Sequence, residues 1–393
     1  MEKAKVSIVR LEDYEKENVY KAVQQSLDLL GGLENIFKPR SQVFVKINHL
    51  SPPSTPDKGI ITHPALAREV LLLLKELGHK IIVGDDIQSK EEDGFLISDY
   101  RQVCEELEVP LINLKEKGFQ KINCKGKVLE KVYVSPVCLE ADYILNLPKL
   151  KTHSFTAYTG AVKNMFGIIP HGLRHNFHRQ YSKSDQFCQM LVDIFSCAPP
   201  HLTIMDAVIA MEGEGPSAGN LRKIGVILAS QDAVALDAAA AKIVGFNPMD
   251  VYTTLHVHER GLGKGKIEEI EIVGEKIHDV QIKEFRHSAV ALGFLQRSLP
   301  SFLHGYLQDQ MSLIAEVRGE KCTACLECIK ICPAKAAKLF EDLVWIDKKA
   351  CIHCMCCHEV CHYHAIKLKR RPLGKMVSGA ETVYKKIKFL FGK

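Results

Sequence analysis

Two runs of four cysteines stand near the end of the chain, and both follow the spacing C-x2-C-x2-C-x3-C. A cubane 4Fe–4S cluster needs four thiolates, and a tight loop with a cysteine at every third position can place three of them around one cluster. The fourth cysteine of such a run points away, toward the neighbouring cluster. We therefore predict one cluster held by Cys322, Cys325, Cys328 and Cys361, and a second held by Cys351, Cys354, Cys357 and Cys332.

This segment resembles the bacterial two-cluster ferredoxins over residues 320–368, with both cysteine runs complete. The resemblance implies a small ferredoxin-like α+β domain, and in so short a segment the clusters would replace a hydrophobic core. His362 departs from the pattern because it stands where the second run usually has proline. One residue separates Cys356 from Cys354, a spacing that suits the loop poorly, so we interpret Cys356 as a spare thiol and not as an alternative ligand.

Zinc is the competing interpretation, since paired C-x2-C motifs also bind this ion. Zinc modules usually place their second pair of ligands farther along the chain and need no third cysteine at equal spacing. The duplicated run of four therefore favours iron–sulfur binding. Nearby histidines are not needed as ligands, and we expect them beside the clusters or exposed: His353, His358 and His364.

The remainder of the chain sets the context for these clusters. Its 393 residues suggest two or three domains. No run approaches the roughly 18 apolar residues of a membrane span, and the first residues do not form a signal peptide, so we expect a cytoplasmic protein with reduced thiols.

The net charge of +5 is concentrated in residues 365–393, which contain nine Lys or Arg and one Glu. The charge of a general nucleic-acid-binding protein is therefore absent.

Apolar runs and helical patterns alternate through the first part of the chain. Uniformly apolar runs predict strands at 5–9, 43–47, 80–84, 142–147, 202–206 and 224–229, and helical periodicity predicts helices at 16–31, 64–77, 184–196 and 232–244. Such alternation is typical of an α/β fold, a mostly parallel sheet with helices on both faces. Residues 119–135 predict an antiparallel hairpin added to this sheet.

Four segments follow from these patterns. We expect an α/β domain at 1–285, a helical connector at 286–318, the ferredoxin-like domain at 319–368 and a basic tail at 369–393. Residues 380–393 have the spacing of a basic amphipathic helix, which would favour a peripheral contact with an anionic membrane or with an acidic redox partner. The alternative is a solvated terminus.

Basic and amide side chains gather where the predicted strand at 142–147 ends. Ligands of open α/β sheets bind beyond the carboxyl ends of strands, so we expect a site for an anionic substrate or cofactor there. We assign Lys46, Lys149 and Asn164 to binding, Lys151, Lys163 and His153 to catalysis, with His153 as acid or base, and note His171, His175 and His178 nearby. The alternative is a basic, solvated surface loop.

Two further loops carry weaker signals. The segment MEGEGPSAGN at 211–220 has small residues that allow close approach of a ligand, but it lacks the lysine of a P-loop, and we favour a structural turn. Asp85 and Asp86 end another predicted strand. We expect them to cap the following segment.

Several of these segments together are similar to the domain-of-unknown-function 362 family, across most of residues 1–275. They are VFVKIN at 43–48, THPAL at 62–66, VGDD at 83–86, NLPKLKTHS at 146–154, GAVKNMFG at 160–167, MEGEGPSAG at 211–219 and DAVALDAAAAKIVGF at 232–246. Members of this family often carry a ferredoxin-like module. The resemblance implies an iron–sulfur protein with an α/β partner domain, and it implies no substrate.

Three classes of function remain open on this basis. The leading hypothesis is a ferredoxin-type oxidoreductase, in which two clusters exchange electrons with an α/β domain that binds a small anion. The second is a non-redox or metal-cofactor enzyme, resembling the lactate racemase type in general layout, with His153, His171, His175 or His178 as ligands. The third is a redox carrier or assembly factor that docks on a partner protein.

Overall fold

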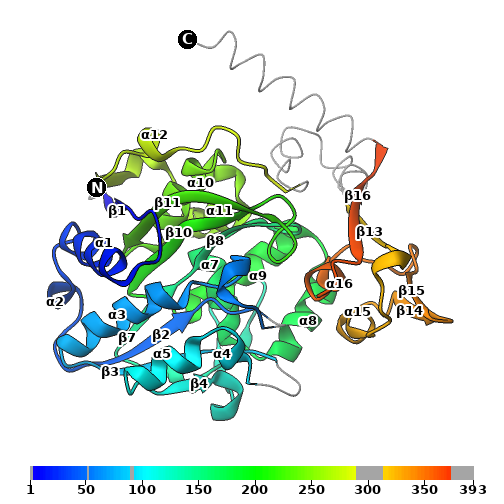
Figure 1. Cartoon of the computed structure of the whole chain (residues 1–393), viewed down its shortest axis with the longest axis horizontal. Helices are drawn as coiled ribbons and strands as arrows, with labels where there is room; N and C mark the ends of the chain where they lie inside the picture. The colour runs from blue at the N-terminus through cyan, green and yellow to red at the C-terminus, as the bar shows by residue number, and fades with distance from the viewer. Residues whose placement is uncertain (1–2, 51–52, 89–92, 289–312, 373–393) are drawn as a thin grey trace, which may run out of the picture.

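A ten-stranded sheet forms the centre of the large domain in the computed structural model, which describes residues 3–50, 53–88, 93–288 and 313–372 (Figure 1). Its strands are β1 (Ala4–Arg10), β2 (Gln42–Ile47), β3 (Lys80–Asp85), β4 (Leu111–Asn113), β7 (Tyr143–Leu147), β8 (Lys149–His153), β9 (Ala157–Thr159), β10 (Leu202–Glu212), β11 (Asn220–Ser230) and β12 (Ile270–Gly274). The main order is β12-β1-β11-β10-β7-β2-β3-β4, and β8 pairs with β10 and β9.

Most neighbouring strands run parallel, as the sequence predicts. Antiparallel pairing occurs where β11 meets β1 and β10, and where β9 meets β8. All six predicted strands are present, with ends shifted by a few residues. The segment after β7 differs from the prediction, because the chain continues beyond Pro148 as β8, parallel to β10 like β7, instead of entering a loop. It can do so because β10 extends far enough to pair with it, Met211 lying opposite Lys151.

Helices cover both faces of the sheet. They are α1 (Lys16–Asp28), α2 (Leu33–Ile36), α3 (Pro64–Glu76), α4 (Gly94–Ile97), α5 (Tyr100–Glu106), α6 (Pro136–Glu140), α7 (Ala161–Asn164), α8 (His171–Gln180), α9 (Ser184–Cys197), α10 (Ala233–Ile243), α11 (Tyr252–Glu259) and α12 (Ile277–Val280). Alternate side chains of β2 enter opposite cores, as the period of a strand requires. Val43 and Val45 pack with α1, α3 and α5, while Phe44 packs in the core that contains α9 and α10. The predicted two-sided α/β architecture is confirmed.

The predicted hairpin forms, but it does not join the large sheet. Its strands β5 (Gln120–Asn123) and β6 (Lys131–Val134) make a two-stranded sheet of their own. The buried carboxylate of Asp193 in α9 accepts hydrogen bonds from the backbone N–H groups of Lys127, Val128 and Leu129, each at 2.8 Å. This anchor fixes the hairpin against α9, and neither of its strands pairs with the edge strand β4.

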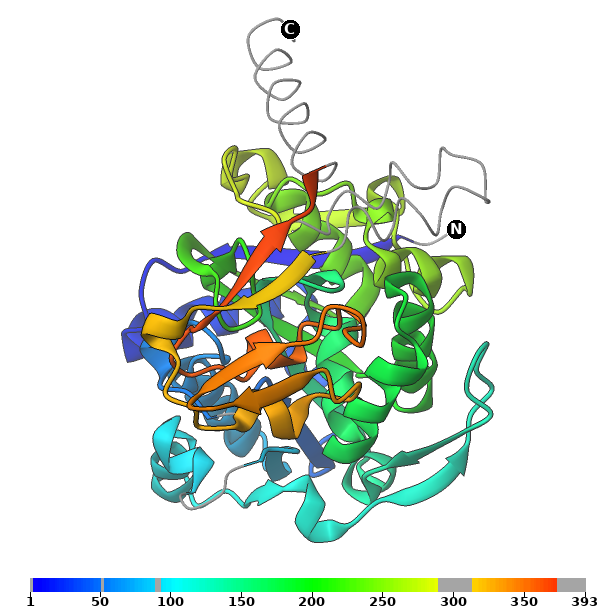
Figure 2. The same cartoon turned by 90° about the vertical axis from the view of Figure 1, so that its right-hand side faces the viewer.

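The cysteine-rich unit lies at one side of the large domain (Figures 1 and 2). It contains β13 (Leu313–Val317) paired with β16 (Ile366–Arg370), β14 (Ala337–Phe340) paired with β15 (Leu343–Ile346), and the short helices α15 (Glu327–Ile331) and α16 (Cys356–Glu359). The unit therefore begins before residue 319, inside the range expected for the connector, and β16 extends into the range expected for the tail. Residues 289–312 and the amphipathic pattern at 380–393 lie outside the described residues.

Within the described part of the chain, the helices are too short or too polar to cross a membrane.

Candidate functional site

The eight cysteines of the two runs line two small cavities in the cysteine-rich unit. One cavity is lined by Cys322, Cys325, Cys328 and Cys361, and the other by Cys332, Cys351, Cys354 and Cys357. Each cavity therefore receives three cysteines from one run and the fourth from the other run. This is the grouping that the spacing predicts for two cubane clusters.

The two runs share one backbone conformation. The amide of Ala336 donates to Cys332 Sγ at 3.1 Å, and the amide of Ala365 donates to Cys361 Sγ at 3.2 Å, so the last thiol of each run has the same backbone partner. Left-handed residues also occur at equivalent places: Ala324 and His353, Leu326 and Met355, and Lys335 and His364. Both loops thus present thiols to their cavities in the same way.

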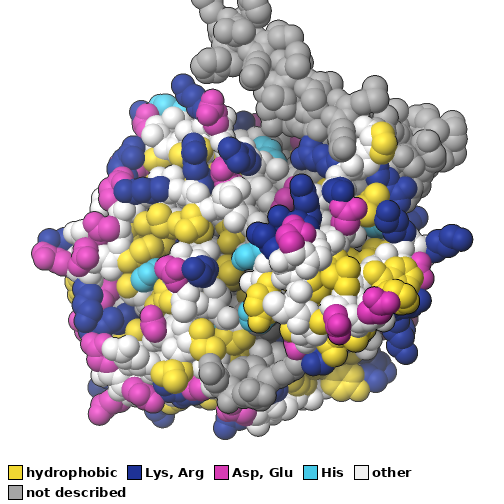
Figure 3. All heavy atoms as spheres, turned by 45° about the vertical axis from the view of Figure 1, so that its right-hand side comes forward, with side chains coloured by type: hydrophobic (Ala, Val, Ile, Leu, Met, Phe, Trp, Pro, Cys, Tyr) yellow, Lys and Arg dark blue, Asp and Glu magenta, His cyan; other side chains and the backbone are white. Residues whose placement is uncertain are grey.

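A cavity of about 120 Å³ lies between the large domain and the cysteine-rich unit. The large domain contributes Lys46 of β2, Lys151 of β8 and Lys163 of α7, and the cysteine-rich unit contributes Cys356 and Glu359 of α16. We call this space the lysine cavity. In the space-filling view, histidine side chains reach the surface near the boundary between the two parts (Figure 3). The remaining polar or charged lining residues are Asn48, His49, Asp85, Thr159, Asn164, His171, Arg174, His175 and His178.

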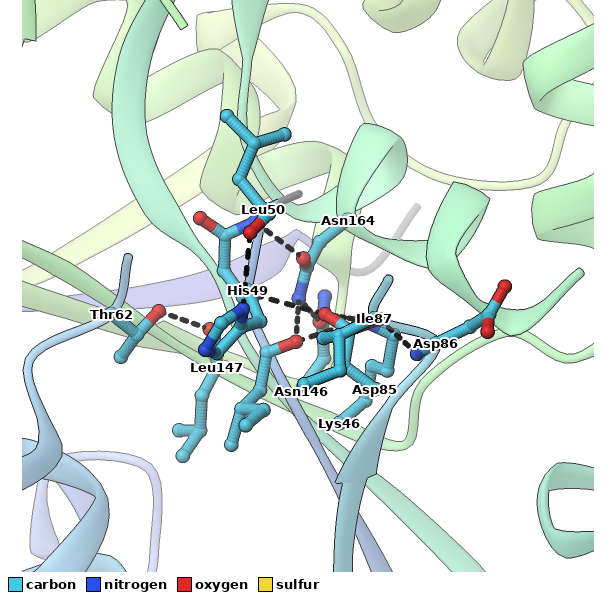
Figure 4. A network of polar contacts seen from close by, with 12 residues as sticks. Lys46, His49, Leu50, Thr62, Asp85, Asp86, Ile87, Asn146, Leu147 and Asn164 are labelled. Carbon is cyan, nitrogen blue, oxygen red and sulfur yellow. Dashed lines mark hydrogen bonds and ion pairs between the residues drawn. The ribbon is translucent and has the colours of Figure 1, made fainter. Parts of the chain in front are cut away.

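Buried amides connect two walls of the lysine cavity. Lys151 Nζ donates to Asn48 Oδ1 at 2.9 Å and to the carbonyl of Ile60. Asn48 in turn donates to Asn164 Oδ1 at 3.0 Å, and Asn164 Nδ2 donates to Asn146 Oδ1 at 2.7 Å (Figure 4). The chain of amides fixes the position of Lys151 relative to α7. Asn48 and Asn146, each in or directly after a predicted strand, were not among the predicted site residues.

Two acidic residues beside the cavity form ion pairs with basic side chains. Lys46 Nζ lies 2.8 Å from Asp85 Oδ2, and Arg174 Nη2 lies 2.6 Å from Asp86 Oδ2 (the first pair appears in Figure 4). Asp85 also accepts the backbone N–H of His49 at 2.9 Å. The expectation that this acidic pair caps the following segment is wrong, because both carboxylates instead form ion pairs at the end of β3. Helix α4 is capped by Asp93.

Lys149 lies outside the lining of the lysine cavity. Its Nζ is 2.8 Å from Asp206 Oδ2 and 3.0 Å from the hydroxyl of Tyr14, and Asp206 also accepts the backbone N–H of His63. Lys149 and Asp206 are both buried. Lys149 therefore compensates a buried carboxylate, whereas Lys151, two residues farther along β8, faces the cavity.

Replacing Lys149 with methionine is expected to lower the free energy of unfolding by about 3–5 kcal/mol, because Asp206 would remain buried without its cation. If the lysine cavity binds the anion that the sequence leads us to expect, that binding should persist in this variant under conditions where it is folded. The matched variant Lys163→Met should do the reverse, losing anion binding at little cost in stability. Urea unfolding followed by circular dichroism, together with calorimetric anion titration, distinguishes the two roles.

His153 and Glu359 meet at the edge of the lysine cavity. His153 Nδ1 accepts the backbone N–H of Phe155 at 3.0 Å, and its Nε2 lies 3.6 Å from Glu359 Oε1. Burial holds the pKa of His153 well below its usual range, so the ring is neutral and carries its proton on Nε2, toward Glu359.

Burial also shifts the pKa values of the charged groups in this region. It raises the pKa of Glu359 to about 7, although Lys163 and Lys151 oppose the shift. Burial lowers the pKa of Lys151 to about 7, with a smaller contribution from the positive charge of Lys163.

The histidines of the predicted basic loop lie on helix α8. His171, His175 and His178 all line the lysine cavity, and burial lowers their pKa values to about 3, 4 and 3, so all three are neutral at physiological pH. Within the described residues, no three His, Cys, Asp or Glu side chains are placed so that they could hold a single metal ion.

The loop at 211–220 joins the two parts of the molecule. Ser217 Oγ donates to the carbonyl of Glu359 at 2.9 Å, and the ring of His358 lies 3.4 Å from the carbonyl of Glu214. On the other side of the loop, the carbonyl of Gly215 accepts a hydrogen bond from the backbone N–H of Ser154 at 2.9 Å. This turn therefore holds α16 against the end of β8.

Comparisons with known proteins place these features in context. Residues 43–242 match the family described as domain of unknown function 362. The chain is 30% identical over 259 residues to a thylakoid-associated protein of Synechocystis sp., covering 65% of this chain and 79% of that protein.

Two solved structures show weaker similarity. The lactate racemase apoprotein of Thermoanaerobacterium thermosaccharolyticum matches at 11% identity and a TM-score of 0.39, over 59% of this chain and 55% of that one. A protein from Thermotoga maritima matches at 14% identity and a TM-score of 0.37, over 57% of each chain. The chain thus spans little more than half the length of either solved chain.

Proposed function

The chain belongs to the domain-of-unknown-function 362 family, and from this premise we propose that it is an iron–sulfur oxidoreductase of ferredoxin type. In this proposal, the cysteine-rich unit binds two 4Fe–4S clusters, and the lysine cavity binds a small anionic substrate or cofactor. The clusters, when bound, would supply one-electron transfer to or from that ligand.

Helix α16 carries this proposal, because it contributes to both kinds of cavity. Cys354, just before the helix, and Cys357 within it line one of the thiol cavities. Cys356 and Glu359 of the same helix line the lysine cavity. A single turn of helix therefore separates the place expected for a cluster from the place expected for a substrate.

The grouping of the cysteines supports the proposed clusters. Each cavity offers four cysteines, and in each a backbone amide already donates to one sulfur, as expected for a thiolate ligand whose hydrogen bonds tune the potential. Cys356 faces the lysine cavity instead of a thiol cavity, which supports its interpretation as a spare thiol.

Lys151 and Lys163 are the side chains proposed to contact the anion. Within the described residues neither forms an ion pair, whereas Lys46 is held by Asp85. Asn164 orients the amide network beside them. We propose that His153 acts through Glu359, since its only free ring nitrogen points at that carboxylate.

Electron delivery requires a redox partner protein, which we propose docks on the cysteine-rich unit. The name of the Synechocystis relative refers to association with thylakoids. For the present chain, peripheral membrane contact through the basic tail stays a prediction, as does a cytoplasmic location.

Purification without oxygen tests the cluster assignment. We expect a brown protein with about eight irons and about eight sulfides per chain, and reduced-cluster signals in electron paramagnetic resonance after addition of dithionite. Stoichiometric zinc with little iron would contradict the proposal. A stoichiometric metal other than iron, beside the clusters, would instead favour the metal-cofactor enzyme.

Anion binding should weaken as the pH rises through neutrality. The pKa of Lys151 in the folded protein is about 7, below its ordinary value, so its positive charge is present below that pH and is lost above it. We expect the affinity for acetate, measured by calorimetry between about pH 6 and 9, to fall by up to about tenfold per unit above the apparent pKa. Lys151→Arg should flatten the profile, because arginine keeps its charge. A wild-type profile without this fall would contradict the role of Lys151.

A further inference from the structure

We propose that the lysine cavity takes a small anion with a single negative charge, and that Glu359 sets this selectivity. The inference rests on the anion-binding role proposed above and specifies its substrate class. It follows from the charges that line the cavity and from the atoms there that lack partners.

Most charged groups around the cavity cancel in pairs. Lys46 is neutralised by Asp85 at 2.8 Å, and Arg174 is neutralised by Asp86 at 2.6 Å. The three histidines of α8 contribute no charge at physiological pH. Only Lys151, Lys163 and Glu359 remain to set the net charge of the cavity.

These three groups sum to one positive charge. The ammonium group of Lys151 and the carboxylate of Glu359 cancel each other. Lys163 then supplies the remaining charge, and its only described ring contact is with Phe166, 5.9 Å away. Because an uncompensated charge is costly in a buried cavity, the complementary ligand carries one negative charge. A dianion would leave a second, uncompensated charge beside Glu359.

Unpartnered atoms indicate where the ligand binds. Arg174 Nε, His178 Nδ1 and Glu359 Oε1 are buried without a hydrogen-bond partner. A singly charged carboxylate or similar oxyanion can accept hydrogen bonds from the cationic side chains of the cavity. A neutral hydrogen-bond donor on the same molecule, such as an amide or hydroxyl group, can then face Glu359.

The selectivity depends on the cysteine-rich unit. Among the described residues, Glu359 is the only acidic residue of this unit that lines the lysine cavity. Ser217 fixes the position of Glu359 by donating to its carbonyl at 2.9 Å. The unit proposed to bring electrons to the cavity thus also determines the charge of the ligand that the cavity accepts.

A pair of isosteric anions tests this proposal. Malonamate carries one negative charge and malonate carries two near neutral pH, and they have the same number of non-hydrogen atoms. With the full, anaerobically prepared chain, we expect calorimetric affinity for malonamate to exceed that for malonate by at least about tenfold. In Glu359→Gln the affinity for malonate should rise by at least about tenfold. Glu341→Gln, the same change on an exposed turn of the same unit, should leave both affinities unchanged.

The outcomes separate this inference from the proposed function. If wild type binds malonate as tightly as malonamate or more tightly, the charge class is wrong while the anion site stands. If malonate affinity does not rise in Glu359→Gln with normal iron content, Glu359 does not set the selectivity. If neither anion binds, the anion-binding role fails together with the inference, and iron content still reports on the clusters independently.

Discussion

Replacing Cys332 with alanine is expected to deplete the cluster held with the later cysteine run and to leave about four irons per chain. Cys332 belongs to the first run in sequence, yet it lines the cavity that contains Cys351, Cys354 and Cys357. Loss of one thiolate leaves one iron without its protein ligand, so the affected cluster should be unstable toward oxygen. Iron analysis and electron paramagnetic resonance of the reduced variant measure the loss.

The reciprocal variant and a neutral one provide the controls. Cys361→Ala should deplete the cluster held with Cys322, Cys325 and Cys328, whose cavity Cys361 lines. Cys356→Ala should retain all of the iron, because this thiol faces the lysine cavity. If the spectra instead showed that each variant loses the cluster of its own run, the crossed ligation would be wrong.

The central sheet could be predicted because its strands are short runs of apolar residues. A strand that is buried on both faces has no polar side, and 43–47 shows this directly, with every residue from Val43 to Ile47 buried. The hairpin at 120–134 was predicted locally and misplaced globally. Its position depends on Asp193, a residue in α9 whose role no local pattern reveals.

The separation of Lys149 from the lysine cavity could not be predicted from the sequence. Lys149 and Lys151 stand on either side of Leu150 in β8, and the sequence pattern gives them the same surroundings. What distinguishes them is Asp206 on β10, which pairs with Lys149 only. Because strands are paired across long distances in sequence, the partner of a buried lysine is visible only in the fold.

Glu359 was missed for a related reason. Glu359 lies between two cysteines of the second run, where the spacing of the cysteines predicts cluster ligands. No pattern in the neighbouring residues predicts a polar site there. Its function depends on the contact of α16 with the loop at 211–220. That loop connects β10 and β11, and the segment that it holds lies far along the chain.

Asp237 is expected to be the residue outside the cavity whose loss most affects anion binding. Its carboxylate, buried in α10, accepts the backbone N–H groups of Ala161 at 2.6 Å and Val162 at 3.0 Å, and the hydroxyl of Tyr158 at 3.2 Å. These bonds fix the start of α7, the helix that carries Lys163. Gly160 permits this approach, because a Cβ there would lie 2.1 Å from Asp237 Oδ1.

Asp237→Ala should therefore lower the free energy of unfolding by about 3–5 kcal/mol, since three buried donors lose their acceptor. It should also weaken acetate binding by at least about tenfold at temperatures where the variant is folded, because Lys163 is no longer held in place. Circular dichroism follows the large domain, while the fluorescence of Trp345, the only tryptophan, follows the cysteine-rich unit.

Asp232→Ala is the matched control. Asp232 caps the same helix by accepting hydrogen bonds from the backbone N–H groups of Val234 and Ala235. The substitution should therefore lower the free energy of unfolding by about 1 kcal/mol and leave the affinity for acetate unchanged. Equal acetate affinities in wild type and Asp237→Ala would show that α7 keeps its position without this carboxylate.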